Sequence, residues 1–121
     1  MDSICVNIAP ESIYHITATA IRCGSDWNVA VCGGSAHHVG AVALAVYEPV
    51  RDSATVSTLT VFTHRDDRVA SHMAKELSRA LKCTVCVSAG IHIDDADAAQ
   101  LDMLQANCAA CCQELIARLT R

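Results

Sequence analysis

Aromatic residues are scarce in this chain of 121 residues, where they make up only 3% of the sequence. So few aromatic rings leave no platform on which the bases of a single-stranded nucleic acid could stack. Basic residues are also few, because nine Lys and Arg stand against thirteen Asp and Glu, for a formal net charge of -4. Without an excess of cations, the usual electrostatic basis for binding DNA or RNA is missing. We therefore expect no nucleic acid partner.

Long hydrophobic runs are absent as well. The longest apolar stretch, about residues 41–47, is far too short to span a bilayer. The first five residues contain no basic region followed by a long apolar segment, so they do not predict a secretory signal. We expect a soluble, cytoplasmic protein with no membrane partner. With 52% hydrophobic and 18% charged residues, residues 1–121 are expected to form a single domain around one core.

Eight cysteines are abundant against this background. In a reducing compartment we expect free thiols rather than disulfides. The pairs Cys83-x-x-Cys86 and Cys108-x-x-Cys111 have a spacing similar to that of zinc ribbons. The first pair opens a β-branched strand, where residues three apart point to opposite faces, and the second continues the apolar stripe of a helix. We favour small buried hydrophobic residues here, and a redox or zinc-storage role is the alternative.

Five strands and two helices are predicted. Stretches rich in β-branched or alternating apolar residues indicate the strands, at residues 12–23, 27–32, 39–47, 54–63 and 84–88. Apolar stripes indicate helices over 66–82 and 97–119, the second with a capping box formed by Asp97 and Gln100. The order β-β-β-β-α-β-α predicts an α+β fold. We expect a four-stranded antiparallel meander, a parallel βαβ crossover, and two helices packed on one face of a five-stranded mixed sheet.

Histidines lie at the ends of three predicted strands, in residues 36–40, 64–67 and 90–94. A tight loop, an antiparallel pairing and a parallel crossover would bring all three segments to one edge of the sheet. The N-termini of both helices and the guanidinium of Arg65 would lie nearby. Neutral imidazoles in such a place favour a divalent metal ion together with a phosphorylated ligand.

Each of these histidines also has an ordinary structural explanation. Taken singly, His64 or His92 is more often a surface residue than a ligand. Of the adjacent pair His37 and His38, one side chain can simply face water. His15 either joins the edge or is a half-buried strand residue, and His72 is expected in solvent on the polar face of the first helix.

The aspartates near this edge have two interpretations. Asp66, Asp67, Asp94 and Asp95 either cap helices or orient an imidazole, and Asp94, two residues after His92, is the best candidate for orienting one. The pair Gly33-Gly34 lacks the spacing of a dinucleotide fingerprint or a P-loop and predicts a turn. No Ser/His/Asp or Cys/His arrangement typical of a nucleophile stands out, and no cysteine adjoins a histidine of this edge in the sequence. We therefore expect no enzyme, and a small metalloenzyme that activates water at the histidines is the alternative.

Several of these segments together resemble a known family. They are Gly33-Gly34, the string from His38 to Ala45, His64-Arg65-Asp66-Asp67, and the string Ala89-Gly90-Ile91-His92-Ile93-Asp94. In this order and spacing, they are similar to the LpdD-like prenylated-flavin chaperones, small accessory proteins of UbiD-type aromatic acid decarboxylases. The resemblance covers about residues 12–119. Its most specific part is the last string, which is followed by a capped helix.

The resemblance implies that the chain binds reduced prenylated FMN, helped by a divalent metal ion, and delivers it to a UbiD-type decarboxylase. A flavin prenyltransferase is a further implied partner. By position, His38, His64 and His92 would hold the metal or contact the flavin phosphate. The other implied cofactor-binding residues are Gly33, Gly34, His37, Arg65, Asp66 and Asp94. The chain departs from the family pattern at Ala36-His37, where a proline precedes a single histidine, and at Thr63, where a glycine is expected.

A carrier of this cofactor needs a positive anchor for the phosphate, an apolar floor for the ring and prenyl group, and an open mouth. We expect the metal and the helix N-termini to supply the anchor and the Ala/Val-rich sheet to supply the floor. No acid/base pair is needed. The small residues in the last helix stripe also indicate packing between subunits, so we expect a homo-oligomer.

Overall fold

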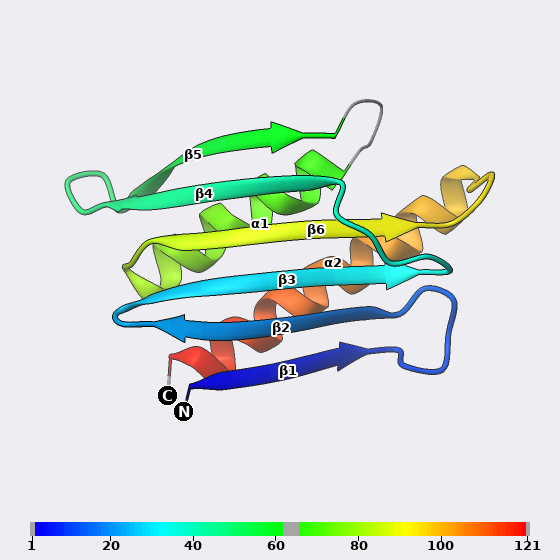
Figure 1. Cartoon of the computed structure of the whole chain (residues 1–121), viewed down its shortest axis with the longest axis horizontal. Coiled ribbons are helices and arrows are strands. Elements are labelled where there is room, and N and C mark those ends of the chain that lie inside the picture. Colours follow the sequence, from blue (N-terminus) through cyan, green and yellow to red (C-terminus); the bar gives the residue numbers. More distant parts are fainter. Residues whose placement is uncertain (1, 62–65, 121) are drawn as a thin grey trace.

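Both helices pack on the same face of one six-stranded mixed sheet (Figure 1). The structure is a computed structural model and describes residues 2–61 and 66–120. Its elements in chain order are β1 (Ser3–Ile8), β2 (Ile16–Cys23), β3 (Asp26–Gly34), β4 (Ala41–Glu48), β5 (Ser53–Thr60), α1 (Asp66–Leu81), β6 (Val85–His92) and α2 (Ala98–Leu119). The α+β class, the mixed sheet and the placement of both helices on one face are as predicted.

The sheet has one strand more than the five that the sequence predicts. This extra strand, β1, pairs antiparallel with β2, and Ile8 lies opposite Ile16. A signal for β1 is present in the sequence, because Ile4, Val6 and Ile8 alternate with polar or small residues. Val6 is buried in the core, and Ile4 and Ile8 are partly buried and pack against the core. Residues 12–15, predicted as the start of β2, form a turn instead, in which the N–H of His15 donates to the carbonyl of Ser12.

The order of strands across the sheet is β1-β2-β3-β6-β4-β5. Strand β6 lies between β3 and β4, parallel to β3 and antiparallel to β4. The predicted continuous meander of the first four strands is therefore wrong. Strand β5 runs parallel to β6 but is separated from it by β4, which pairs with both. The inward side chains of β6, Val85 and Val87, are fully buried, which fits a strand at the centre of the sheet.

The core lies between the sheet and the two helices. On the sheet side it combines larger side chains such as Ile16 and Val31 with small residues, among them Ala18, Ala20, Ala41, Ala43 and Ala45, all nearly inaccessible to solvent. The small side chains let both helices approach closely, and the helices contribute the large buried side chains of Met73, Leu77 and Leu115. Burying each of these three stabilises the fold by about 1.5–3 kcal/mol. The cysteines of α2 also lie in this core, as predicted for small hydrophobic residues.

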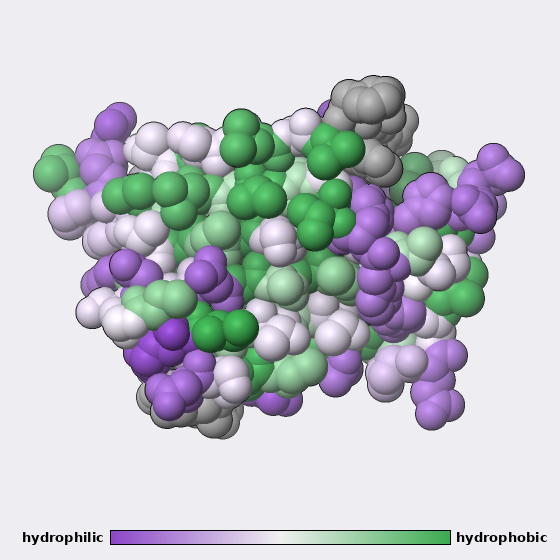
Figure 2. Space-filling view, viewed as in Figure 1, coloured by the Kyte–Doolittle hydropathy of each residue, from purple (hydrophilic) through white to green (hydrophobic). Residues whose placement is uncertain are grey.

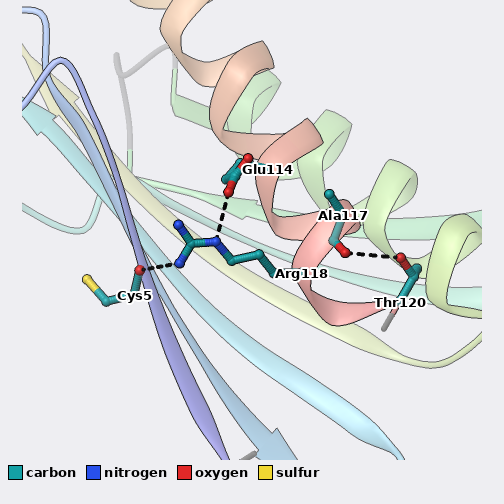
Figure 3. Close-up of polar contacts among 5 residues, drawn as sticks. All are labelled: Cys5, Glu114, Ala117, Arg118 and Thr120. Carbon is teal, nitrogen blue, oxygen red and sulfur yellow. Dashed lines mark hydrogen bonds and ion pairs between the residues drawn. The ribbon is translucent and has the colours of Figure 1, made fainter.

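Both ends of α2 are fixed by specific contacts. At its start, the Asp97 side chain accepts a hydrogen bond of 2.8 Å from the N–H of Gln100, and the Gln100 side chain accepts one of 2.9 Å from the N–H of Asp97. This is the predicted capping box. Near its other end, Arg118 forms an ion pair with Glu114 and reaches the carbonyl of Cys5 in β1 (Figure 3). In the described part of the chain, neither helix is long and apolar enough to cross a membrane.

Candidate functional site at the histidine edge

Four histidines from three separate parts of the chain lie at one edge of the sheet. The strand directions bring them together, because β3 and β6 end at this edge and β2 and β4 begin there. His92 is the last residue of β6 and pairs with Gly34, the last of β3. His15 precedes β2, and His37 and His38 lie in the loop between β3 and β4. We call His15, His37, His38 and His92, with Asp66 and Asp94, the histidine edge.

His38 is held by a buried carboxylate. Its Nε2 atom lies 3.1 Å from Oδ2 of Asp66, which is only 5% exposed at the start of α1. The other oxygen of Asp66, Oδ1, accepts a hydrogen bond of 3.0 Å from the N–H of Ile91 in β6. A carboxylate beside Nε2 favours the proton on that nitrogen, so the lone pair of a neutral ring is on Nδ1. The sequence allowed Asp66 either to cap a helix or to orient an imidazole, and in the structure it contacts an imidazole.

Two glycines make this close packing of backbones possible. A β-carbon at Gly90 would collide with the carbonyl oxygen of His38, and one at Gly40 would collide with Oδ2 of Asp66. The N–H of Gly40 also donates to the carbonyl of Ala89 over 2.8 Å, which ties the loop to β6. The position of His38 therefore depends on the missing side chains of Gly40, in its own loop, and of Gly90, in β6. Sequence reasoning did not assign either glycine to the site.

His92 has its own carboxylate partner. Its Nε2 atom lies 2.7 Å from Oδ1 of Asp94, the residue that the sequence marked as the best candidate to orient an imidazole. The His92 side chain is 43% exposed, so this pair faces solvent, unlike the His38–Asp66 pair. The rings of His38 and His92 lie edge to face, with centroids 6.2 Å apart. The histidine edge therefore contains two neighbouring imidazoles, each of which contacts a carboxylate.

His15 and His37 form a second imidazole pair. Their Nε2 atoms are 2.8 Å apart, and Nδ1 of His15 lies 2.8 Å from the carbonyl oxygen of Ser12. Because a carbonyl only accepts, Nδ1 of His15 carries a proton, and in a neutral ring Nε2 then accepts the proton of His37. His15 therefore joins the edge rather than lying within a strand. The turn at residues 12–15, which moves His15 to the start of β2, has its signal in Pro10 and Ser12.

The predicted metal ligands are only partly visible. His38 and His92 lie together, whereas His64 and the predicted basic residue Arg65 lie outside the described residues. Within residues 2–61 and 66–120, no three His, Cys, Asp or Glu side chains are arranged to hold a metal ion. Two imidazoles bound tetrahedrally to one ion would have centroids about 5 Å apart. The centroids of His38 and His92, 6.2 Å apart, are wider than this by roughly an ångström.

The paired glycines have a backbone role at this edge. Gly34 has a positive φ of +75°, and a β-carbon on Gly34 would collide with the backbone of His92. A β-carbon on Gly33 would likewise collide with the carbonyl oxygen of His15. The turn predicted at Gly33-Gly34 begins after the end of β3, and Ser35 then donates its N–H to the carbonyl of His92 over 2.8 Å. The glycines therefore set the distance between the histidine-bearing segments.

A groove between α1 and α2 opens beside the histidine edge. Its first part, about 120 Å³, is lined by Asp66 and Ile91 at the edge and by Leu101 and Leu104 of α2. It adjoins a larger cavity of about 350 Å³ farther along the helices. The two parts share four lining residues, Arg68, Val69, Gln105 and Cys108. This groove, rather than the Ala/Val-rich sheet face, is the apolar surface next to the histidines, because the helices cover that sheet face.

The thiols at the groove and beneath it are poor nucleophiles. Burial, with the neighbouring Cys111 second, raises the pKa of Cys108 to about 12. Burial also raises the pKa of Cys111 to about 12 and that of Cys112 to about 11. All three stay protonated at neutral pH, and a protonated thiol neither attacks a substrate nor binds zinc well. All eight cysteines are free thiols, spread over both sides of the sheet rather than gathered as ligands.

The chain is similar to known proteins over nearly its whole length. A chain in the crystal structure of a novel chaperone complex for yeast 20S proteasome assembly has the same fold, with a TM-score of 0.62 and 17% identity, covering 99% of this chain and 97% of that one. Protein LpdD of Lactiplantibacillus plantarum is 27% identical over 88 residues, which are 73% of this chain and 65% of that protein, so the match spans slightly less than two thirds of this relative. Residues 11–120 match the prenylated flavin chaperone LpdD-like domain. The chain therefore belongs to the LpdD-like family of prenylated flavin chaperones.

Proposed function

We propose that this protein binds reduced prenylated FMN at the histidine edge and hands it to a UbiD-type decarboxylase. The observation that carries the proposal is the pair His38 and His92, each with a carboxylate partner, in a chain of the LpdD-like family. Asp66, the partner of His38, also lines the groove. The name of that family specifies a chaperone of a prenylated flavin, which supports a binding role rather than a catalytic one.

Charge at the edge favours a metal-assisted anchor for the flavin phosphate. Asp66 and Asp94 each lie within hydrogen-bond distance of a histidine, so they offset any positive charge on the two rings. The N-terminus of α2 is occupied by its own capping box and offers little to an anion. Arg68 lines the groove beside Asp66, and a further cation at the edge would strengthen the binding of a phosphate with up to two negative charges.

A divalent metal ion would supply that charge. His38 and His92 are the described residues that would hold it, through the ring nitrogen that each carboxylate leaves as the acceptor. The carboxylates also keep the rings oriented. When bound, the ion contributes attraction for the phosphate oxygens, and the protein contributes the position of both rings.

The apolar part of the cofactor fits the groove between α1 and α2. The groove starts at Asp66 and Ile91, next to His38 and His92, and continues along Val69. Its two parts, about 120 and 350 Å³, together fall in the range of ligand pockets, about 300–1,000 Å³. An open groove shields one side of the ring and leaves the other accessible, which suits a carrier that must release its cargo.

Transfer of the cofactor tests this proposal. Under anaerobic conditions, the protein is incubated with prenylated FMN made by a flavin prenyltransferase, desalted, and mixed with an apo-decarboxylase of the UbiD type. We expect the flavin absorbance to remain with the protein after desalting and to move to the decarboxylase, which becomes active. Buffer carried through the same steps is the control. Loss of all flavin on desalting, with no activation above the control, would contradict the proposal.

A further inference from the structure

The face of the sheet opposite the helices is open and apolar. Figure 1 shows both helices behind the sheet, and Figure 2 shows hydrophobic side chains gathered over β4 and β5 on the face toward the viewer. Leu44 and Val46 of β4 and Leu59 of β5 point outward there, and Leu59 is 79% exposed. Val42 lies opposite Leu59 on the neighbouring strand. We call Val42, Leu44, Val46 and Leu59 the apolar ridge.

Charged side chains are missing from the middle of this face. In the described strands, outward positions between the strand ends hold only Ala, Val, Leu, Ile, Ser, Thr, Asn, Cys and Gly. The acidic residues Asp26 and Glu48 lie at the strand ends far from the histidine edge. A chain with 18% charged residues and a net charge of -4 therefore keeps its charges off one broad face. Exposed uncharged patches of this kind mark protein interfaces.

A shallow hollow lies beside the ridge on the same face. It has a volume of about 220 Å³ and is lined by outward residues of β2, β3 and β6, among them Thr19, Ile21, Asn28, Ala30, Cys86 and Ser88. These side chains are mostly smaller than those of the ridge. The surface of this face therefore protrudes over β4 and β5 and is recessed over β2, β3 and β6.

We propose that this open face packs against the same face of a second copy of the chain, forming a homodimer. A two-fold axis parallel to the strands and running along β6, near the centre of the sheet, places β4 over β3 and β5 over β2 of the other copy, so that each ridge lies over the hollow of its partner. An axis across the strands would place ridge on ridge instead. The face is thus complementary to itself in shape, and with no charge in its centre it brings no repulsion.

The size of the face suits such a dimer. Six strands about 4.8 Å apart, with about eight residues of roughly 3.3 Å each, give a face of about 750 Å². A standard interface buries about 800 Å² on each partner, so contacts over the whole face approach that size. Because the axis runs along the strands, both histidine edges would lie at the same end of the dimer. The helices and their grooves would remain on the outside of both copies.

Charge substitutions on the face test the dimer. Leu44→Asp and Leu59→Asp would each bury an unpaired carboxylate in the interface, whereas Met103→Asp, at a similarly exposed site on α2, would not. Sedimentation velocity from about 1 to 100 μM and circular dichroism are measured for each protein. We expect a dimer for the full chain and for Met103→Asp. For the two face variants we expect folded protein whose dimer dissociation constant is raised about 100-fold.

Three results would overturn this inference. The full chain could be monomeric over the whole concentration range, which would indicate that the open face binds a different protein rather than a second copy. A dimer could persist unchanged in both Leu44→Asp and Leu59→Asp. Finally, Met103→Asp alone could dissociate the dimer, which would place the interface on the helices. Because Leu59 is on an edge strand and largely exposed, its variant remains informative even if Leu44→Asp fails to fold.

Discussion

Oδ2 of Asp66 lies 3.1 Å from Nε2 of His38. The second oxygen of the same carboxylate accepts the N–H of Ile91. One buried side chain therefore joins the loop before β4, the start of α1 and the end of β6. The geometry of the histidine edge depends on this carboxylate, and so does part of the stability of the fold.

Replacing Asp66 by alanine should destabilise the protein. The change removes an acceptor from the N–H of Ile91 and a partner from His38, and hydrogen bonds to charged groups contribute about 1.5–3 kcal/mol each. We expect the free energy of unfolding, measured with urea, to fall by about 2–4 kcal/mol. Asp67→Ala, the adjacent position in the first turn of α1, is the matched control and should cost about 0.5 kcal/mol. Equal losses for the two variants would contradict the role given to Asp66.

Gly90→Ala should disturb the edge without removing any polar group. The added methyl would meet the carbonyl of His38, so the loop must move away from β6. Overpacking of this kind costs about 1–3 kcal/mol. We expect lower stability and a shift of the His38 ring signals in NMR spectra, whereas Ser88→Ala on the same strand should leave those signals in place. Unchanged His38 signals in Gly90→Ala would show that the close approach does not position this ring.

Much of the fold follows from local patterns in the sequence. Both helices and the strands β2 to β6 have apolar periodicity of the right kind, and strand direction alone predicts that residues 38 and 92 share an edge. Sequence does not specify which strands are neighbours, because Val85 and Val87 of β6 would be buried equally well beside β3 or beyond β5. The insertion of β6 between β3 and β4 is a property of the packed sheet. Strand β1 was missed although Ile4, Val6 and Ile8 alternate as in a strand.

The candidate site was only partly predictable for a related reason. Asp94 is two residues from His92, so their contact can be foreseen from the sequence. Asp66 is twenty-eight residues from His38, and His37 is twenty-two from His15, so these contacts depend on how the loop between β3 and β4 folds. The groove between α1 and α2 depends on the angle and spacing of two helices, which amphipathic patterns do not give.

Stability should fall at high pH because of the buried thiols. Burial raises the pKa of Cys108 and Cys111 to about 12, above the value of about 8.5 expected for an unfolded chain. Between about pH 9 and 11 the folded chain keeps protons that the unfolded chain has lost. The free energy of unfolding is therefore fully retained below pH 8 and decreases as pH rises through this window.

Urea unfolding at pH 7.5, 9 and 10.5 measures this dependence. Cys108→Ala should show a smaller decrease with pH than the unchanged protein, since one buried thiol no longer contributes. Cys23→Ala is the control, because Cys23 is exposed, and its pH dependence should match that of the unchanged protein. A decrease of the same size in the Cys108 and Cys23 variants would show that burial of Cys108 is not its cause.

Metal binding should depend on the histidine edge and not on the cysteines. We expect titration calorimetry with Mn²⁺ or Zn²⁺ to show a site that is lost in His92→Ala and retained in Cys111→Ser. A chelator should also release prenylated FMN from the loaded protein, because the ion neutralises the phosphate. Loss of the metal in Cys111→Ser with retention in His92→Ala would instead assign the metal to the thiols.

The affinity of the histidine edge for reduced prenylated FMN tests the account most directly. The dissociation constant is measured anaerobically, with Mn²⁺ present, for the unchanged protein, for His38→Ala/His92→Ala and for Arg51→Ala, which changes an exposed residue in the turn between β4 and β5. We predict that the double variant binds about 100-fold more weakly, about 2.7 kcal/mol, while Arg51→Ala binds as the unchanged protein does. Equal affinity of all three proteins, with the double variant folded, would contradict the account.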